Sequence, residues 1–238
     1  MKYLLGLVIG FFTISIAFSQ GSKPVVLVSG KAVNERNMQP VDVDVRVVYE
    51  ELPSGKEAGI ARINPIDGSY KIILPFGKKY SYRANAEGFY SVTKFLDVTK
   101  LKEYKEIEEQ NLFLAPLLVD QVVRINNLFF VGKTEELLPE SYIELDRFVA
   151  FLKVNKKIKI ELGGHTDNQG GLKSNIELSQ KRVDVIATYL KKNKIKSDRI
   201  VVKAYGPTRP LGFNNSEEGR AMNNRIEFKV LSLDYKKK

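Results

Sequence analysis

The sequence predicts two folded units in series, an all-β sandwich and then an α/β unit in which strands and helices alternate. From about residue 24 to 117, short runs of β-branched residues are separated by turn residues. From about residue 119 to 232, strand-like runs alternate with segments whose apolar residues recur at helical spacing. Pro116, at the end of the first pattern, marks the junction between the two.

Composition narrows the classes of function. The 238 residues are 43% hydrophobic and 28% charged, which is ordinary globular composition and excludes wholesale disorder, collagen and coiled coil. The sequence has no cysteine, which excludes disulfides, cysteine-ligated zinc, thiol nucleophiles and lipid attachment through an N-terminal cysteine. His165 is the single histidine, so histidine-rich metal sites are excluded too. We therefore expect no metal, no cofactor and no enzymatic activity.

Residues 1–19 predict a secretory signal peptide. Lys2 is the only charge among them, and the stretch from 3 to 18 is almost unbroken apolar sequence. Ala17 and Ser19 place small residues three positions and one position before a cut that would leave Gln20 first. A retained membrane anchor is the alternative, but the apolar run is short for a membrane span. We expect an exported, periplasmic protein.

The formal net charge of +10 suggests an acidic polymer or a membrane surface near the exported protein. Nucleic acid is not an expected partner, because the basic residues are dispersed along the chain and export separates the protein from it.

Strands in the first half are predicted by runs of β-branched residues, and in one run Val41, Val43, Val45 and Val47 alternate with polar neighbours at period two. Val25–Val33 and Val41–Val48 are rich in β-branched residues, and turn signals recur between the runs. Asp67-Gly68, between Ile60–Ile63 and Tyr70–Leu74, is placed as the turn of a hairpin would be. The aromatic residues of this half are expected in its core: Tyr70, Phe76, Tyr80, Tyr82, Phe89 and Tyr90.

This half, residues 24–117, resembles the carboxypeptidase regulatory-like domain, a small transthyretin-like sandwich. The resemblance rests on runs of turn and strand residues: Gly30-Lys31-Ala32-Val33, Pro40-Val41-Asp42-Val43, Asp67-Gly68-Ser69-Tyr70 and Leu74-Pro75-Phe76-Gly77. It implies a non-catalytic module that serves as a spacer or docks a partner.

In the second half, strands and helices are expected in turn. Strands are predicted over Val122–Val131, Lys157–Gly163, Arg199–Tyr205 and Ile226–Leu231. One helix is predicted from about Pro139, and another follows the glycine-flanked segment 163–171, where Ser174 and Glu177 have the spacing of a capping box. Ser216 is expected to cap a short third helix.

The second predicted helix carries a polar edge beside its apolar face. At 100° per residue, Asn175 and Arg182 fall almost in line, and Ser179 lies between them and the core. Asp167, in the preceding loop, is within reach of this edge. Taken alone, Asp167 is typical of a turn and Arg182 of a solvated helix face.

Residues 119–232 resemble the OmpA-like peptidoglycan-binding domain, shared with peptidoglycan-associated lipoproteins and flagellar motor stators. The segments that match are Leu138-Pro139-Glu140-Ser141, Gly163-Gly164-His165-Thr166-Asp167-Asn168, Asn175-Ile176-Glu177-Leu178-Ser179, Lys181-Arg182, and Glu218-Gly219-Arg220-Ala221-Met222-Asn223 with Arg225-Ile226-Glu227. The resemblance implies a βαβαβ-type α/β sandwich that holds the peptide stem of peptidoglycan at meso-diaminopimelate without catalysis.

Carried over by position, the resemblance assigns the main recognition to Asp167 and Arg182. It places Thr166, Asn175 and Leu178 in the same pocket, with Asn168, Ser179 and Arg225 as further candidates. Two positions depart from the family pattern: Val183 stands where alanine is usual, and Asn224 where a basic residue is usual.

The chemistry of the residues agrees with this assignment. The free end of diaminopimelate is an ammonium and a carboxylate on one carbon, and a carboxylate with a fork-shaped guanidinium complements it. A catalytic or metal-binding His165 is an alternative, but a lone histidine beside two glycines is more typical of a hydrogen bond that orients a loop. Ser179, His165 and Asp167 are the residue types of a triad, but the serine lacks a Gly-x-Ser-x-Gly elbow.

The sequence therefore predicts an exported, non-enzymatic peptidoglycan anchor at the inner face of the outer membrane. Residues 24–117 are expected to dock an outer-membrane or other envelope protein. Two alternatives remain: a scaffold subunit that uses the second half mainly for protein contacts, and a wall hydrolase.

Overall fold

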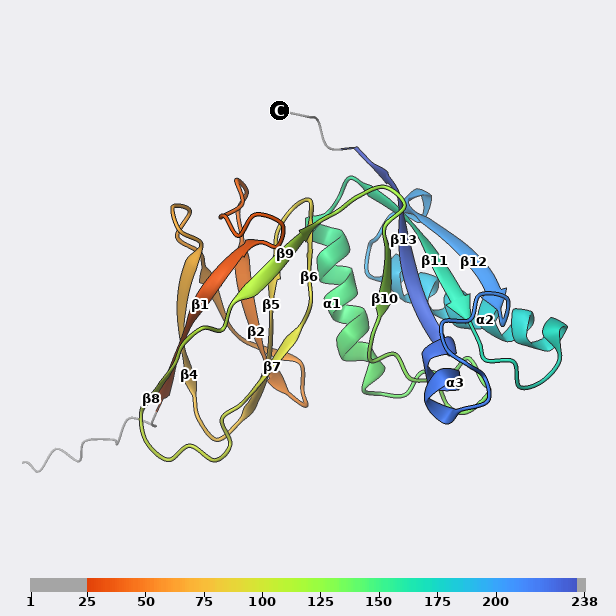
Figure 1. Ribbon diagram of the computed structural model, residues 1–238, viewed down its shortest axis with the longest axis horizontal. Helices are drawn as coiled ribbons and strands as arrows, with labels where there is room; N and C mark the ends of the chain where they lie inside the picture. Colours follow the sequence, from red (N-terminus) through yellow and green to blue (C-terminus); the bar gives the residue numbers. More distant parts are fainter. Residues whose placement is uncertain (1–24, 235–238) are drawn as a thin grey trace, which may run out of the picture.

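The computed structural model describes residues 25–234, which form two β-rich halves with helices in the second half alone (Figure 1). The predicted signal peptide, residues 1–19, lies outside the described residues. Within residues 25–234, none of the helices is both long enough and apolar enough to cross a membrane.

Two sheets make up the N-terminal half. One has the order β4-β1-β9-β6, with β8 added to β1, and the other has the order β3-β2-β5-β7. The strands of the first sheet are β1 (Val25–Asn34), β4 (Ser69–Pro75), β6 (Phe89–Ser91), β8 (Lys105–Ile107) and β9 (Leu112–Pro116). Those of the second are β2 (Arg46–Leu52), β3 (Lys56–Arg62), β5 (Lys79–Asn85) and β7 (Lys94–Asp97).

Both sheets contribute to one hydrophobic core, because alternate side chains of each strand point inward. Val26 and Val28 of β1 are fully buried, and so are Val47 and Tyr49 of β2. Tyr49 stacks on Tyr82, with 5.0 Å between ring centroids. The expected burial of the aromatic residues is confirmed for Tyr70, Tyr80 and Tyr82, whereas Phe76, Phe89 and Tyr90 are only partly buried.

The predicted hairpin at Asp67-Gly68 is wrong. Strands β3 and β4 flank this turn but belong to different sheets, since β3 pairs with β2 and β4 pairs with β1. Gly68 has a φ of +73°, and its carbonyl accepts a hydrogen bond from the backbone N–H of Ala32 in β1. The turn therefore carries the chain from one sheet to the other, and turn residues alone do not distinguish this connection from a hairpin.

The C-terminal half is a four-stranded sheet with helices between its strands. The sheet has the order β10-β13-β11-β12, and β11 and β12 are the parallel pair. Its strands are β10 (Val122–Ile125), β11 (Ile158–His165), β12 (Ile200–Gly206) and β13 (Arg225–Leu233). The helices are α1 (Ser141–Val154), α2 (Leu172–Lys192) and α3 (Glu217–Asn223), with a 3₁₀ turn at Ser197–Arg199. The predicted alternation of strands and helices is confirmed.

Two local expectations in this half are corrected. The strand expected to reach Val131 ends at Ile125, and Asn127 then takes a positive φ of 56°, which ends extended pairing. Helix α2 begins at Leu172 with Gly171 as its N-cap, so Ser174 is inside the helix and its hydroxyl donates to the carbonyl of Gly171. The cap at Ser216 is confirmed, since its side chain accepts from the backbone N–H of Gly219.

Helix α1 lies between the N-terminal sheets and the C-terminal sheet (Figure 1). One side of it enters the C-terminal core through Leu145, Phe148 and Leu152. Tyr90, from β6 of the other half, packs edge-on to Phe151 of α1 and to Phe228 of β13, with ring centroids 5.8 and 6.0 Å away. The second core is therefore covered on one side by a residue of the first half.

Candidate functional site

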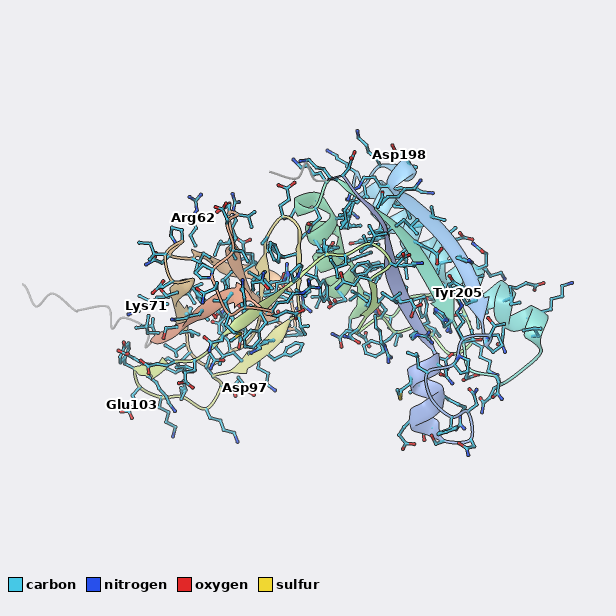
Figure 2. The ribbon with its side chains drawn as sticks, turned by 45° about the horizontal axis from the view of Figure 1, so that its top comes forward. Arg62, Lys71, Asp97, Glu103, Asp198 and Tyr205 are labelled. Atoms are coloured by element: carbon cyan, nitrogen blue, oxygen red, sulfur yellow. The ribbon has the colours of Figure 1, made fainter. Side chains whose placement is uncertain are left out.

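The candidate site lies where β11 ends and α2 begins. Figure 2 labels Asp198 and Tyr205 near opposite ends of β12, and the site is at the Tyr205 end, where Tyr205 stacks on His165 of β11. Gly164 brings α2 close to β11, because a Cβ at this position would lie 2.6 Å from the carbonyl oxygen of Ser179 and 2.8 Å from Val183. This close approach places the loop after β11 beside the first turns of α2.

A pocket of about 440 Å³ opens at this point. All five residues of the predicted main site line it, and so does Arg225. The five are Thr166, Asp167, Asn175, Leu178 and Arg182. In the sequence these five residues lie in a predicted loop and a predicted helix, and the fold brings them to one cavity.

Asn168 and Ser179 do not line the pocket. The backbone N–H of Asn168 donates to the Oδ1 atom of Asn214, and its side chain is exposed. The hydroxyl of Ser179 donates to the carbonyl of Ile176 and accepts from the backbone N–H of Gly206. Ser179 therefore joins α2 to β12, and its hydrogen bonds are not those of a triad nucleophile.

Arg182 is held rigidly against the loop that follows β10. Its Nε donates to the carbonyl of Thr134 at 2.9 Å, and its Nη2 donates to the carbonyl of Gly132 at 2.8 Å. The guanidinium also lies over the ring of Phe130, 4.5 Å from its centroid. Burial lowers the pKa of Arg182 from its usual value, and the charges of Asp167 and Glu135 act in the opposite direction. An anion in the pocket would therefore meet a charge with little water around it.

Asp167 is held by Asn224, one of the two residues that depart from the family pattern. Its Oδ2 accepts from the side-chain amide of Asn224 at 2.7 Å, and its backbone N–H donates to the Oδ1 of Asn224 at 3.1 Å. Its Oδ1 accepts from the backbone N–H of Gln169 at 2.8 Å. Each carboxylate oxygen thus has one protein donor, which leaves acceptor capacity for a ligand ammonium.

Thr166 and Asn175 complete the floor and one edge of the pocket. The Oγ1 of Thr166 is fully enclosed and has no hydrogen-bond partner within residues 25–234. The side-chain amide of Asn175 donates to the carbonyls of Asp167 and Gln169, at 3.3 and 3.5 Å. Asn175 therefore supports the loop that carries Asp167, whereas the Oγ1 of Thr166 is an enclosed polar atom beneath the pocket surface.

His165 is part of the floor and not of a mobile loop. It is buried at the end of β11, and its Nε2 lies 2.9 Å from the Oε1 of Glu227. Arg225 reaches the other oxygen of the same carboxylate at 3.0 Å. These contacts outweigh the effect of burial and hold the pKa of Glu227 below its usual value. The expectation that His165 orients the loop is corrected, because its side chain contacts Glu227 of β13.

Sequence reasoning missed three parts of the pocket. The loop carbonyls of Gly132 and Thr134 carry no side-chain signal, and Arg124 lies on a short edge strand. Asn224 stands where a basic residue is usual, and nothing in the sequence predicts its contact with Asp167. Across the described chain, no group of three or more histidine or carboxylate side chains is arranged to hold a metal ion.

Comparisons with known proteins match the half of the chain that contains this pocket. The model of the OmpA family matches residues 129–225. The peptidoglycan-binding protein ArfA of Mycobacterium tuberculosis (strain ATCC 25618 / H37Rv) is 35% identical over 94 residues, which cover 40% of this chain and 29% of ArfA. The peptidoglycan-associated lipoprotein of Legionella pneumophila is 28% identical over 104 residues, which cover 43% of this chain and 59% of the lipoprotein.

A solved structure, that of the cell wall anchor of the T6SS from Pseudomonas aeruginosa, is 30% identical. The match covers 46% of this chain and 78% of that one, with a TM-score of 0.40. The chain spans only 35% to 59% of the length of the first curated relatives that it matches.

Proposed function

Since the C-terminal half of this chain is an OmpA-family domain, we propose that the protein is a non-catalytic cell-wall anchor that binds the diaminopimelate stem peptide of peptidoglycan. Two relatives, a peptidoglycan-binding protein and a peptidoglycan-associated lipoprotein, support the ligand class. Asp167 and Arg182 would make the main contacts, and Thr166, Asn175 and Leu178 would shape the pocket around them.

One observation carries the proposal: Asp167 and Arg182 line the same open pocket, and each keeps unused hydrogen-bonding capacity. Arg182 gives Nε and Nη2 to backbone carbonyls, and within residues 25–234 its Nη1 has no partner. No carboxylate of the described chain forms a salt bridge with Arg182. A ligand carboxylate would supply the missing acceptor, while Asp167 would accept from the ammonium on the same carbon.

The expected affinity is modest. Charge-assisted hydrogen bonds contribute roughly 1.5–3 kcal/mol each, so two of them with backbone contacts give about millimolar to micromolar binding. A lysine stem lacks the carboxylate and would leave Arg182 unpaired, at a cost of roughly 1–3 kcal/mol. Selection for diaminopimelate over lysine follows from that difference.

We assign the other half a docking role. In this proposal residues 24–117 form a carboxypeptidase regulatory-like sandwich that binds an outer-membrane or envelope protein, and residues 119–232 hold the wall. Removal of the signal peptide, residues 1–19, would place the protein in the periplasm, at the inner face of the outer membrane. The two sheets that share one core support the sandwich assignment.

The test is sedimentation with purified diaminopimelate-type sacculi. The protein should sediment with sacculi, and the Asp167→Ala/Arg182→Ala double variant should remain in the supernatant. The Lys181→Ala/Asp184→Ala double variant is the matched control, because it also removes one acid and one base, both from the exposed face of α2. Equal sedimentation of both variants would refute the assigned residues.

Two further readouts separate the alternatives. A scaffold that uses this half for protein contacts alone would keep its envelope partners without the Asp167–Arg182 pair and would not sediment with sacculi. A hydrolase would release soluble muropeptides from the sacculi during incubation, whereas an anchor would release none.

A further inference from the structure

The pocket carries more positive charge than a dipolar amino-acid terminus requires. Four cationic side chains line it, and Asp167 is the one carboxylate that does. The cationic residues are Arg124, Lys133, Arg182 and Arg225. An ammonium and a carboxylate on one carbon occupy one acid and one base, which Asp167 and Arg182 supply. The remaining charge favours a ligand that carries a second negative group.

Arg225 repeats the arrangement of Arg182 on the other side of the pocket. It is buried, 7% exposed, and its Nε binds Glu227 at 3.0 Å. Its Nη1 donates to the carbonyls of Arg209 and Asn223. Nη2 is the nitrogen left without a partner in the described chain, and it is not among the fully enclosed polar atoms. Arg225, like Arg182, therefore keeps one donor that solvent or a ligand can reach.

Arg124 lies on the same face of the sheet as Arg225. Arg124 of β10 is paired with Glu227 of the antiparallel strand β13, and Arg225 is two residues from Glu227. Residues paired across antiparallel strands share a face, and so do residues two apart on one strand. Arg124 is exposed, and its Nη2 donates to the carbonyl of Ala221 at 3.3 Å, which leaves Nε and Nη1 open.

The local charges leave this corner positive. Glu227 is shared between His165 and Arg225, and within residues 25–234 it forms no ion pair with Arg124. Two guanidinium groups with one carboxylate between them retain one net positive charge. Their free nitrogens are donors of the kind that bind carboxylates in charge-assisted pairs.

We propose that Arg124 and Arg225 form a second carboxylate subsite in the pocket, separate from the Asp167–Arg182 pair. This inference rests on the proposed function and deepens it. The ligand is a stem peptide in which a residue adjoining diaminopimelate carries a free carboxylate. A stem whose neighbouring carboxyl group is amidated keeps the dipolar terminus but loses the contact with Arg124 and Arg225, and so binds more weakly.

The test uses the whole mature chain and synthetic tripeptides, measured by calorimetry. The probe is L-alanyl-γ-D-glutamyl-meso-diaminopimelate, prepared with every carboxyl group free, with the glutamate α-carboxyl amidated, or with the carboxyl adjoining the peptide bond of diaminopimelate amidated. The peptide with the amidated glutamate α-carboxyl should bind about tenfold more weakly than the free peptide, whereas amidation of the diaminopimelate carboxyl should leave the affinity unchanged.

The Arg124→Gln variant tests the residue itself. It should bind the free peptide about tenfold more weakly than the unaltered protein does, and it should not distinguish the free peptide from the discriminating amide. Arg124 is exposed, so this change spares the core. The Lys133→Gln variant is the control, because Lys133 also lines the pocket and is exposed. It should keep the discrimination between free and amidated peptides.

Each failure has its own meaning. If the three peptides bind equally well and binding still depends on Asp167, the second subsite is refuted and the proposed function stands. The same holds if Arg124→Gln and Lys133→Gln weaken peptide binding equally and both still distinguish the free peptide from the amide. The overall positive charge of the pocket would then explain the loss of affinity. If no peptide binds, both the subsite and the proposed function fail.

Discussion

Glu50 and Arg147 form a buried ion pair that joins the two halves, with 2.8 Å between Oε2 of Glu50 and Nε of Arg147. Glu50 lies on β2 and Arg147 on α1, and their side chains are 10% and 6% exposed. Arg83 binds the other oxygen of Glu50 at 2.6 Å, and Glu144 binds Arg147 at 3.1 Å. Ser81 accepts from Arg147 at 2.6 Å. Two acids and two bases thus balance in the junction, and helix α1, which packs on the C-terminal core, is fixed to the N-terminal half.

We expect the Arg147→Met variant to lose about 3–5 kcal/mol of unfolding free energy, because Glu144 loses its partner and Glu50 keeps only Arg83, which leaves one negative charge in the junction uncompensated. Urea denaturation followed by circular dichroism measures this. Lys153→Met, on the exposed side of the same helix, is the control and should change stability by less than about 0.5 kcal/mol. Similar results for the two variants would contradict a structural role for the junction.

Asn224→Ala should weaken binding of a diaminopimelate peptide without unfolding the protein. The change removes the 2.7 Å hydrogen bond to Asp167 and the acceptor of the Asp167 backbone N–H. One such bond contributes about 1 kcal/mol, so the dissociation constant should rise roughly fivefold. Calorimetry measures it, with Asn215→Ala, exposed and outside the pocket, as the control. Unchanged affinity in Asn224→Ala would mean that Asp167 does not need this support.

Local sequence patterns predict those helices and strands that bury one face. A run of β-branched residues identified β1, and helical spacing identified α1 and α2, because burial of one face of a helix imposes that period. The strand expected over Val41–Val48 is corrected, because β2 begins only at Arg46 and runs to Leu52. No local sequence pattern predicts which strand a given strand pairs with. The turn at Asp67-Gly68 has suitable residues for a hairpin, yet β4 pairs with β1 through the long register from Val25 to Lys31.

For the site, the sequence placed Asp167 and Arg182 through a motif, and helical geometry put Asn175 and Arg182 on one edge. The groups that hold them come from distant segments. Gly132 and Thr134 contact Arg182 across about fifty residues of chain, and Asn224 contacts Asp167 across 57 positions. Such contacts depend on how the elements pack, which no local pattern encodes.

Gly164→Ala should destabilise the protein through the packing of α2 on β11. The new Cβ would lie 2.6 Å from a backbone oxygen of Ser179 and 2.8 Å from Val183, so the helix must move away from the strand. Overpacking of this kind costs roughly 1–3 kcal/mol, measurable by urea denaturation. At Gly171 a Cβ would meet only the Ser174 hydroxyl at 3.5 Å, so Gly171→Ala is the control and should be tolerated. Equal stability of the two variants would contradict the close approach.

The carboxylate of Glu227 should give the protein an acid-sensitive component of stability. Burial would raise its pKa, but the contacts with His165 and Arg225 outweigh burial and lower it. Because the folded state then binds this proton less readily than the unfolded state, the contribution is present above the pKa of the unfolded chain. It is lost as the pH falls through the lowered pKa of the folded state.

In the Glu227→Gln variant we therefore expect lower stability than in the unaltered protein at neutral pH and a smaller loss of stability on acidification, so that the two curves converge at low pH. Urea denaturation at a series of pH values from neutral into the acid range measures both. Glu218→Gln, which removes an exposed carboxylate from α3, controls for the change in net charge. If the Glu227→Gln curve runs parallel to that of the unaltered protein throughout, the contacts of Glu227 with His165 and Arg225 do not stabilise the pocket floor.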